Sequence, residues 1–431
     1  MVEPRIIPRA NHPLSRRDVD PDALKVLYRL RQYEHIAYLV GGSVRDLLLG
    51  RKPKDFDIGT SAHPYQVKKL FRNCWIIGRR FRLAHVRFGP KVIEVATFRR
   101  QVEPGEEVVQ DGVPAPDPST AEGEHLIHHD NTFGTPEQDA FRRDFTINAL
   151  FYDIATFSII DYVGGLDDLG AGVVRSIGDP DVRLKEDPVR MLRAIALASR
   201  LDFSLDSALE DSIRRHRHEI ARSSAPRLLE ELYKILRAGS SEKTFRWLAD
   251  VGLLEPIAPE LHRGAAQSLW RSLAALDAFR RQFASTPDAL TNPILLGTLL
   301  VPLGIPLHPN RPTPADDDPP ADDRKRRTPV PRLGELPVAR RDVERLRQIM
   351  GLQRRLRDTG ASPRARRALA HRNVFKDALT WMEVHGDAPR LVDEWRSYLA
   401  QPQAEDTGNE GQRPPRRRRR RRRRFRAAPE S

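Results

Sequence analysis

Two aspartates separated by one residue, Asp55 and Asp57, are the side chains of this 431-residue sequence best suited to chemistry. In an extended segment, residues i and i+2 project from the same side, so the two carboxylates lie next to each other. Mg²⁺ prefers carboxylate oxygens as protein ligands, and a pair of such ions catalyses phosphoryl transfer. An isolated Asp-x-Asp pattern is usually an ordinary surface turn, so its meaning here depends on the neighbouring residues.

A glycine turn lies just upstream of the aspartates, in the segment Gly41-Gly42-Ser43-Val44-Arg45. The apolar run 36–40 before it predicts a strand, and the pattern of 44–49 after it predicts a helix. Glycines let backbone amides approach a triphosphate, the N-terminus of the helix attracts anions, and Arg45 adds positive charge. A strand, a glycine turn, a helix and two aspartates within about twenty residues together favour nucleotide binding.

The elements that must position these residues form an α+β arrangement. Strand-like and helical patterns between residues 20 and 170 predict a small mixed sheet with helices, and helical spacing dominates the chain after residue 187. Expected strands are 36–40, 56–58, 74–77, 84–88 and 92–98, and expected helices include 20–33 and 65–72. The predicted units are a disordered N-terminus (1–19), a catalytic head domain (20–170) with a mobile loop (101–134), a helical neck domain (171–262), a helical body domain (263–400) with a disordered insert (309–331), and a disordered basic tail (401–431).

Composition narrows the class of protein and its location. The net charge is +14, and half of it lies in residues 401–431, which predicts a polyanionic partner. The single cysteine, Cys74, excludes an internal disulfide framework and reads as a core residue. The sequence has neither a signal-peptide pattern nor an apolar run long enough to span a bilayer, so we expect a soluble, cytoplasmic protein without a membrane partner.

Four segments resemble the tRNA nucleotidyltransferase and poly(A) polymerase family, within the nucleotidyltransferase superfamily. They are LVGGSVRDLLLG at 39–50, KDFDIGT at 54–60, RRDFTINAL at 142–150 and EDPVR at 186–190. The resemblance covers roughly residues 20–260. It implies a nucleotidyltransferase-type head domain followed by helical neck and body domains.

The same resemblance assigns roles to the RRDFTINAL segment. Asp144 would be the third metal-binding and catalytic carboxylate beside Asp55 and Asp57, and two Mg²⁺ ions, with Mn²⁺ as a possible substitute, would be the cofactor. Arg142, Arg143 and Asn148 would lie against the ribose and phosphates of the nucleotide. Without the family, Asp144 would be read as an ordinary helix N-cap.

In the family, the pair that matches Asp187 and Arg190 selects the base. The two residues stand three apart at the start of a predicted helix, so they share a face and can offer an acceptor and a forked donor to one base edge. The alternative is structural: Asp187 before Pro188 is also a good N-cap, and Arg190 would then only form an ion pair with it.

The segment GRRFRLAHV at 78–86 resembles the bacterial poly(A) polymerase branch of the family rather than the CCA-adding branch. Its three arginines, Arg79, Arg80 and Arg82, form a positive loop suited to triphosphate or RNA. The nine consecutive arginines from Arg416 through Arg420 to Arg424 predict binding to RNA phosphates without sequence preference.

These resemblances imply a template-independent polynucleotide adenylyltransferase. It would transfer AMP from ATP to RNA 3′ ends, release pyrophosphate, and act in mRNA polyadenylation and RNA decay. Two alternatives stay open: a CCA-adding or A-adding tRNA nucleotidyltransferase, and a non-catalytic RNA-binding protein that kept the fold. The second is disfavoured because all three carboxylates are present.

Overall fold

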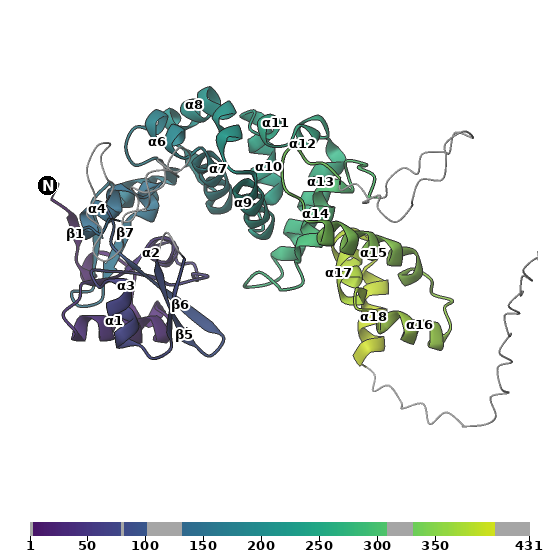
Figure 1. The fold of residues 1–431 in the computed structure, drawn as a ribbon, viewed down its shortest axis with the longest axis horizontal. Coiled ribbons are helices and arrows are strands. Elements are labelled where there is room, and N and C mark those ends of the chain that lie inside the picture. Colours follow the sequence, from purple (N-terminus) through teal and green to yellow (C-terminus); the bar gives the residue numbers. More distant parts are fainter. Residues whose placement is uncertain (1–2, 79–81, 101–131, 308–330, 401–431) are drawn as a thin grey trace, which may run out of the picture.

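The computed structural model describes residues 3–78, 82–100, 132–307 and 331–400. Its elements follow one another along an arc, with a sheet and its helices at one end and α15–α18 at the other (Figure 1). This arrangement confirms the predicted α+β class, with an N-terminal sheet and a helical C-terminal region. Within the ranges described, none of the helices is long and apolar enough to cross a bilayer.

Eight strands form the main sheet in the order β1-β8-β7-β2-β3-β6-β5-β4. β3 and β6 are parallel and every other neighbouring pair is antiparallel, so the sheet is mixed, as predicted. The strands are β1 (Arg5–Ile7), β2 (Ala37–Val40), β3 (Asp57–Thr60), β4 (Cys74–Ile77), β5 (Leu83–Phe88), β6 (Lys91–Thr97), β7 (Leu150–Asp153) and β8 (Ser158–Asp161).

The larger hydrophobic core begins between one face of this sheet and two helices, α1 (Pro21–Gln32) and α3 (Pro64–Leu70), and continues through the helices that follow, as far as Trp395. Helix α1 begins as the sequence predicts, because the Asp20 carboxylate accepts hydrogen bonds from the amides at the second and third helical positions. Leu30 from α1 and Val86 from β5 are completely buried in this core. Cys74 is buried in it as well, which confirms its reading as a core residue.

A smaller core covers part of the opposite face, around Val40, Phe98 and Phe151. Helix α4 (Pro136–Phe141) contributes Ala140 to it. The outer strands β4, β5 and β6 contribute no residue to this second core. The two faces of the sheet are therefore covered unequally.

The N-terminal segment differs from the prediction of a disordered 1–19. β1 pairs with β8, and Leu14 is 1% exposed in the larger core. The prediction was wrong because a three-residue strand has too little periodicity to be recognised, while its partner lies more than 150 residues away. β7 and β8 were missed for the same reason, since both are short and buried on both faces.

After the sheet the chain is almost entirely helical, apart from a two-stranded pairing of β9 (Val173–Val174) and β10 (Ser204–Leu205). The α-helices are α2 (Gly42–Leu48) in the sheet region, then α5 (Gly165–Ala171), α6 (Pro180–Glu186), α7 (Val189–Leu201), α8 (Ser207–His216), α9 (Ala225–Arg237), α10 (Ser241–Asp250), α11 (Leu254–Ile257), α12 (Pro259–Arg263), α13 (Gln267–Arg280), α14 (Asn292–Leu300), α15 (Arg340–Leu356), α16 (Pro363–Ala370), α17 (Phe375–His385) and α18 (Pro389–Ala400). The tail and nearly all of the predicted loop 101–134 and insert 309–331 lie outside the described residues. The predicted domain boundaries stay predictions.

Candidate nucleotide and metal site

The glycine turn lies between β2 and α2, as the sequence predicts. Gly41 has a φ of +70° and a ψ of −139°, a backbone conformation that only glycine adopts without strain. A Cβ atom at Gly41 would lie 3.2 Å from Nη1 of Arg143, so the guanidinium of Arg143 lies close against the turn. Arg143 is held there by Asp139, which accepts hydrogen bonds of 3.1 and 2.8 Å. The glycine turn therefore has the partly exposed positive charge of Arg143 directly beside it.

Two residues predicted to face the triphosphate turn inward instead. The hydroxyl of Ser43 donates to the backbone carbonyl of Val40 at 2.8 Å and is buried. The side chain of Arg45 is 3% exposed and contacts the carboxylate of Asp46 at 2.8 and 2.6 Å and the side-chain oxygen of Asn148. Burial lowers the pKa of Arg45, and Asp46 opposes that effect. These side chains support the turn from inside, and their contact with the nucleotide stays a prediction.

The two aspartates of the Asp-x-Asp pattern differ in environment. The side chain of Asp55 is 69% exposed, with the ammonium of Lys54 at 3.6 Å. Asp57 begins β3 and faces Glu94 of β6 in the parallel register. Burial, Glu94 and Asp55 raise the pKa of Asp57 to about 6, while Arg143 opposes the rise. The negative charge gathered around Asp57 is what a bound divalent cation would relieve, so this donor set fits Mg²⁺.

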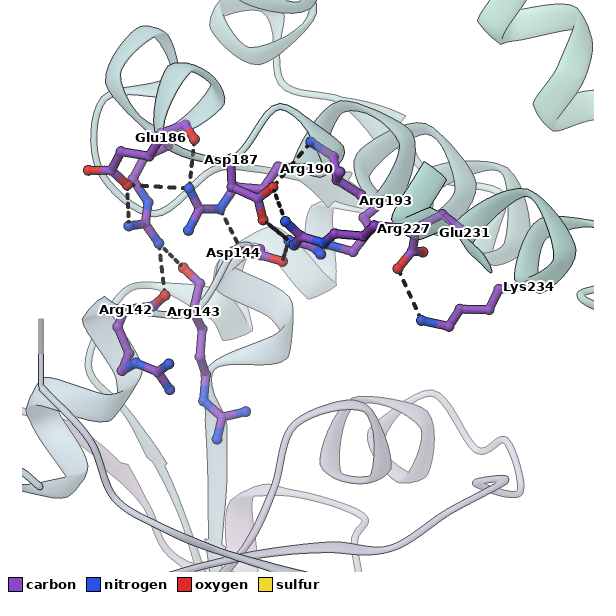
Figure 2. A network of polar contacts seen from close by, with 12 residues as sticks. Arg142, Arg143, Asp144, Glu186, Asp187, Arg190, Arg193, Arg227, Glu231 and Lys234 are labelled. Carbon is purple, nitrogen blue, oxygen red and sulfur yellow. Dashed lines mark hydrogen bonds and ion pairs between the residues drawn. The ribbon is translucent and has the colours of Figure 1, made fainter. Parts of the chain in front are cut away.

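Asp144 lies in a different environment from these aspartates. Its carboxylate accepts a hydrogen bond from Nε of Arg190 at 2.8 Å and pairs with Nη2 of Arg193 at 2.8 Å (Figure 2). Among the residues that the structure describes, there is no group of three His, Cys, Asp or Glu side chains arranged to hold a metal ion. The structure therefore does not bring Asp144 to Asp55 and Asp57, and its role as third ligand stays a prediction.

Asp187 lies between the end of α6 and the start of α7, and its carboxylate contacts two arginines. Arg227 of α9 forks onto both carboxylate oxygens at 2.9 and 2.6 Å, and Arg193 contacts Asp187 at 2.9 Å (Figure 2). Burial alone would raise the pKa of Asp187, but Arg227, Arg193 and Arg190 together lower it. The Asp187 carboxylate also accepts the amide of Val189 at 3.3 Å, as an N-cap would.

Arg190 does not form the predicted ion pair with Asp187. Besides Asp144, its guanidinium contacts Glu186 at 3.3 Å and donates to the backbone carbonyl of Arg183 at 2.6 Å. Asp187 and Arg190 therefore belong to one arginine-rich network, joined directly by the backbone amide of Arg190, which donates to the carbonyl of Asp187 at 3.0 Å, and not by an ion pair of their side chains. Both remain near each other, since the charge of Arg190 acts on the Asp187 carboxylate.

Arg183 ties the RRDFTINAL segment to the helices. Its Nη2 donates to the backbone carbonyls of Arg142 and Arg143 at 2.8 and 2.9 Å. Figure 2 shows the side chains of Arg142 and Arg143 pointing away from this network, toward the sheet. The backbone carbonyl of Asn148 accepts a hydrogen bond from Arg143 at 3.2 Å, and the side-chain oxygen of Asn148 accepts one from Arg45.

Sequence reasoning missed several residues that shape the site: Glu94, Asp139, Arg183, Arg193 and Arg227. Glu94 carried a usable signal, because an acid alternating with buried Ile93 and Val95 must lie on the other face of its strand. Arg193 is three residues after Arg190 and so lies on a neighbouring part of the helix surface. Arg227 carried no local signal.

The predicted RNA-binding residues are mostly outside the described ranges. Arg79, Arg80, Arg416, Arg420 and Arg424 are among them. The guanidinium carbon of Arg82 lies 5.9 Å from the ring centre of Tyr65. Contact of these arginines with RNA stays a prediction.

Two family models match the chain in the order expected for this architecture. Residues 37–175 match the poly A polymerase head domain, and residues 202–264 match the probable RNA and SrmB-binding site of polymerase A. These two segments are therefore similar to two successive parts of poly(A) polymerases. The poly(A) polymerase I of Salmonella typhimurium is 50% identical over 260 residues, which are 60% of this chain and 54% of the relative. The chain therefore matches about half the length of such relatives.

The CCA-adding branch of the family is also similar, at a greater distance. The CCA-adding enzyme of Lactobacillus helveticus is 37% identical over 240 residues, 56% of each chain. The crystal structure of the Bacillus stearothermophilus CCA-adding enzyme in complex with CTP superposes with a TM-score of 0.56 at 24% identity, over 89% of this chain and 83% of that one. This likeness shows that the chain has the fold of that CCA-adding enzyme.

Proposed function

We propose that the chain is a polynucleotide adenylyltransferase, which transfers AMP from ATP to the 3′ ends of RNA and releases pyrophosphate. The observation that carries the proposal is the acidic group around Asp57, whose pKa is raised to about 6 beside Glu94. It lies within a segment that matches the poly A polymerase head domain, downstream of a glycine turn that Arg143 flanks. Perturbed carboxyl groups beside an anion-binding turn are what phosphoryl transfer requires.

Asp55 and Asp57 would hold the divalent cofactor, two Mg²⁺ ions or Mn²⁺ in their place, with Glu94 as the neighbouring carboxylate on β6. When bound, the ions would lower the pKa of the RNA 3′ hydroxyl and neutralise charge that develops on the leaving pyrophosphate. Asp144 joins this set only if Arg190 and Arg193 release it, since both now neutralise its charge. We therefore assign Asp144 first to joining the head to the neck.

The chain's own residues would orient the nucleotide. Backbone amides at Gly41 and Gly42 can approach phosphate oxygens closely, and Arg143 lies against the same turn with charge to offer. At the base, Asp187 would accept a hydrogen bond from an amino group and Arg190 would donate one to a ring nitrogen. The Asp187 carboxylate is already oriented by Arg227, so it would meet the base in a fixed position.

The second candidate is a CCA-adding or A-adding enzyme, which the 37% identical relative and the shared fold favour. Two primers separate the candidates: an unstructured A-ended RNA and a tRNA that lacks its CCA end. Each is incubated with ATP alone, CTP alone and both. Long ATP-dependent ladders on both primers support the poly(A) reading, whereas additions that stop after C, C and A on the tRNA overturn it.

A non-catalytic RNA-binding protein is tested by the chemistry itself. We expect Mg²⁺-dependent release of pyrophosphate from ATP in the presence of RNA, abolished in Asp55→Ala with the fold intact by circular dichroism. A wild-type protein that retains RNA but releases no pyrophosphate would contradict the enzymatic proposal. Action on mRNA 3′ ends and a cytoplasmic location belong to the same proposal.

A further inference from the structure

A straight row of four residues crosses the sheet from the acidic group to its edge strand. Asp57 faces Glu94, Glu94 faces His85, and His85 faces Trp75 on β4. Residues that face each other in neighbouring strands project from the same side of a sheet. Strands lie about 4.8 Å apart, so three steps place the backbone of Trp75 about 14 Å from that of Asp57. We call these four residues the cross-strand row.

The outer end of the cross-strand row is open to solvent. Trp75 is 53% exposed, and Ile77 and Val92 on the same three strands are 51% and 47% exposed. The alternating residue Cys74 is buried on the opposite face, where α3 packs. Trp75 is also the one tryptophan of the five in the chain that is exposed, and all five are described. The exposed indole has exposed Ile77 next to it on the same face of β4 and exposed Val92 two strands away, and such an apolar surface marks a site of binding.

An exposed cation near the outer end of the row, Arg87, favours a nucleic acid strand over a protein as the partner of Trp75, while the acids of the row lie toward Asp57, with Glu94 paired to His85 at 3.5 Å. Arg87 lies two residues after His85 on β5, so it projects from the face that Trp75 occupies, and it is exposed. Its Nε donates to the carbonyl of Gly89 at 2.7 Å, which holds the guanidinium beside the sheet. An aromatic platform with a nearby cation is the combination that proteins use to bind single-stranded nucleic acids.

We propose that Trp75 stacks on a base of the RNA strand whose 3′ end is extended at Asp57. The proposal rests on the proposed function, because the acidic end of the cross-strand row is where that end would react. Successive stacked nucleotides rise about 3.4 Å, so about 14 Å is about four steps and corresponds to about the fifth nucleotide from the 3′ end, or to an earlier one if the strand is extended. A strand of two stacked nucleotides that starts at Asp57 does not reach Trp75.

The test measures the binding of two oligoadenylates, one of eight nucleotides and one of two, with EDTA present and ATP absent. Binding is monitored by tryptophan fluorescence and by the fluorescence anisotropy of labelled RNA. We expect the eight-nucleotide RNA to quench the emission of Trp75. Trp75→Ala should weaken its affinity about five-fold or more, because stacking on one aromatic side chain contributes that much. Trp75→Phe should keep most of the affinity and lose the quenching. The two-nucleotide RNA should show no difference between the variants.

The matched control is Tyr28→Ala. Tyr28 is 45% exposed on α1, which covers the opposite face of the sheet, and its replacement should leave the affinity unchanged. The proposal is overturned if Trp75→Ala binds the eight-nucleotide RNA as tightly as the wild type, or if Tyr28→Ala weakens binding equally. If Trp75 binds RNA but no pyrophosphate is released, the proposed function fails and the platform stands. If Trp75→Ala extends RNA and binds the eight-nucleotide RNA as the wild type does, the stacking role of Trp75 is refuted and the proposed function stands.

Discussion

The carboxylate of Asp144 lies 2.8 Å from the guanidinium of Arg193, which also contacts Asp187 at 2.9 Å. Asp144 belongs to the segment between α4 and β7, whereas Arg193 belongs to α7. One arginine thus joins the sheet-containing head to the carboxylate that we assign to base selection. A movement of the head relative to α7 would change the position of Asp187 through this shared guanidinium.

The first prediction separates the two roles of Asp144. Asp144→Asn removes charge from its contacts with Arg190 and Arg193, so we expect the free energy of unfolding to fall by about 1–3 kcal/mol. The rise in melting temperature on adding Mg²⁺ should remain, because that response depends on Asp55 and Asp57. Thermal unfolding with and without Mg²⁺ measures both, and Asp55→Asn serves as the comparison. Loss of the Mg²⁺ response in Asp144→Asn would restore Asp144 as a metal ligand.

A second prediction concerns pH. Burial and the neighbouring acids raise the pKa of Asp57 from its ordinary value of 3.8 to about 6 in the folded chain, so the folded chain disfavours the carboxylate. An acid with a raised pKa destabilises the fold as pH rises from about 4 to 6, and the full penalty of up to about 3 kcal/mol persists above that range. Without metal, Asp57→Asn should therefore stabilise the fold at pH 7.5 and much less at pH 4.5.

Urea unfolding at the two pH values, in the presence of EDTA, measures this effect. Asp211→Asn, at an exposed position of α8, is the control and should change little at either pH. An equal gain for Asp57→Asn at both pH values would show that the carboxyl group is not held neutral by its surroundings.

The local elements of the site could be predicted from the sequence, but its long-range partners could not. The turn at Gly41 and the helix at Asp20 follow from residues within one helical turn, so the patterns predict them well. The direction of Arg45 depends on Asn148, which lies 103 residues away. A side chain that seems free to meet a phosphate in the sequence is thus buried by a distant partner.

Glu94 illustrates the same limit within the sheet. Its strand was predicted, and its alternation with Ile93 and Val95 could have placed it on the other face of that strand, although this placement was not made. That it faces Asp57 depends on the parallel register of β3 and β6, which two separate strand patterns do not encode. The pairing of Asp187 with Arg227 is likewise a consequence of how α9 packs against α7.

The third prediction tests whether Arg227 orients Asp187 for base selection. Arg227→Ala removes the two hydrogen bonds that Arg227 donates to the carboxylate and leaves those from Arg193 and Val189. The preference in kcat/KM for ATP over CTP should then fall about ten-fold, since a well-placed polar pair discriminates bases by about 1–3 kcal/mol. Arg222→Ala is the control, because Arg222 is an exposed partner of Glu219 alone. Single-nucleotide incorporation assays give the ratio, and an unchanged ATP preference in Arg227→Ala would refute the orienting role.

The last prediction concerns the tail, residues 401–431, which carries eleven arginines and four acids. Each phosphate contact releases counterions, so log K for RNA falls with log salt in proportion to the number of contacts. A chain truncated after Ala400 should bind an unstructured RNA about ten-fold more weakly at low salt, with a shallower salt dependence. Replacing Arg416–Arg424 by nine lysines keeps the charge and should preserve the slope. Because the proposed chemistry uses Asp57 and the proposed stacking uses Trp75, and neither belongs to the tail, truncation should leave kcat at saturating RNA unchanged. Equal salt slopes for the full and truncated chains would exclude the tail from RNA binding.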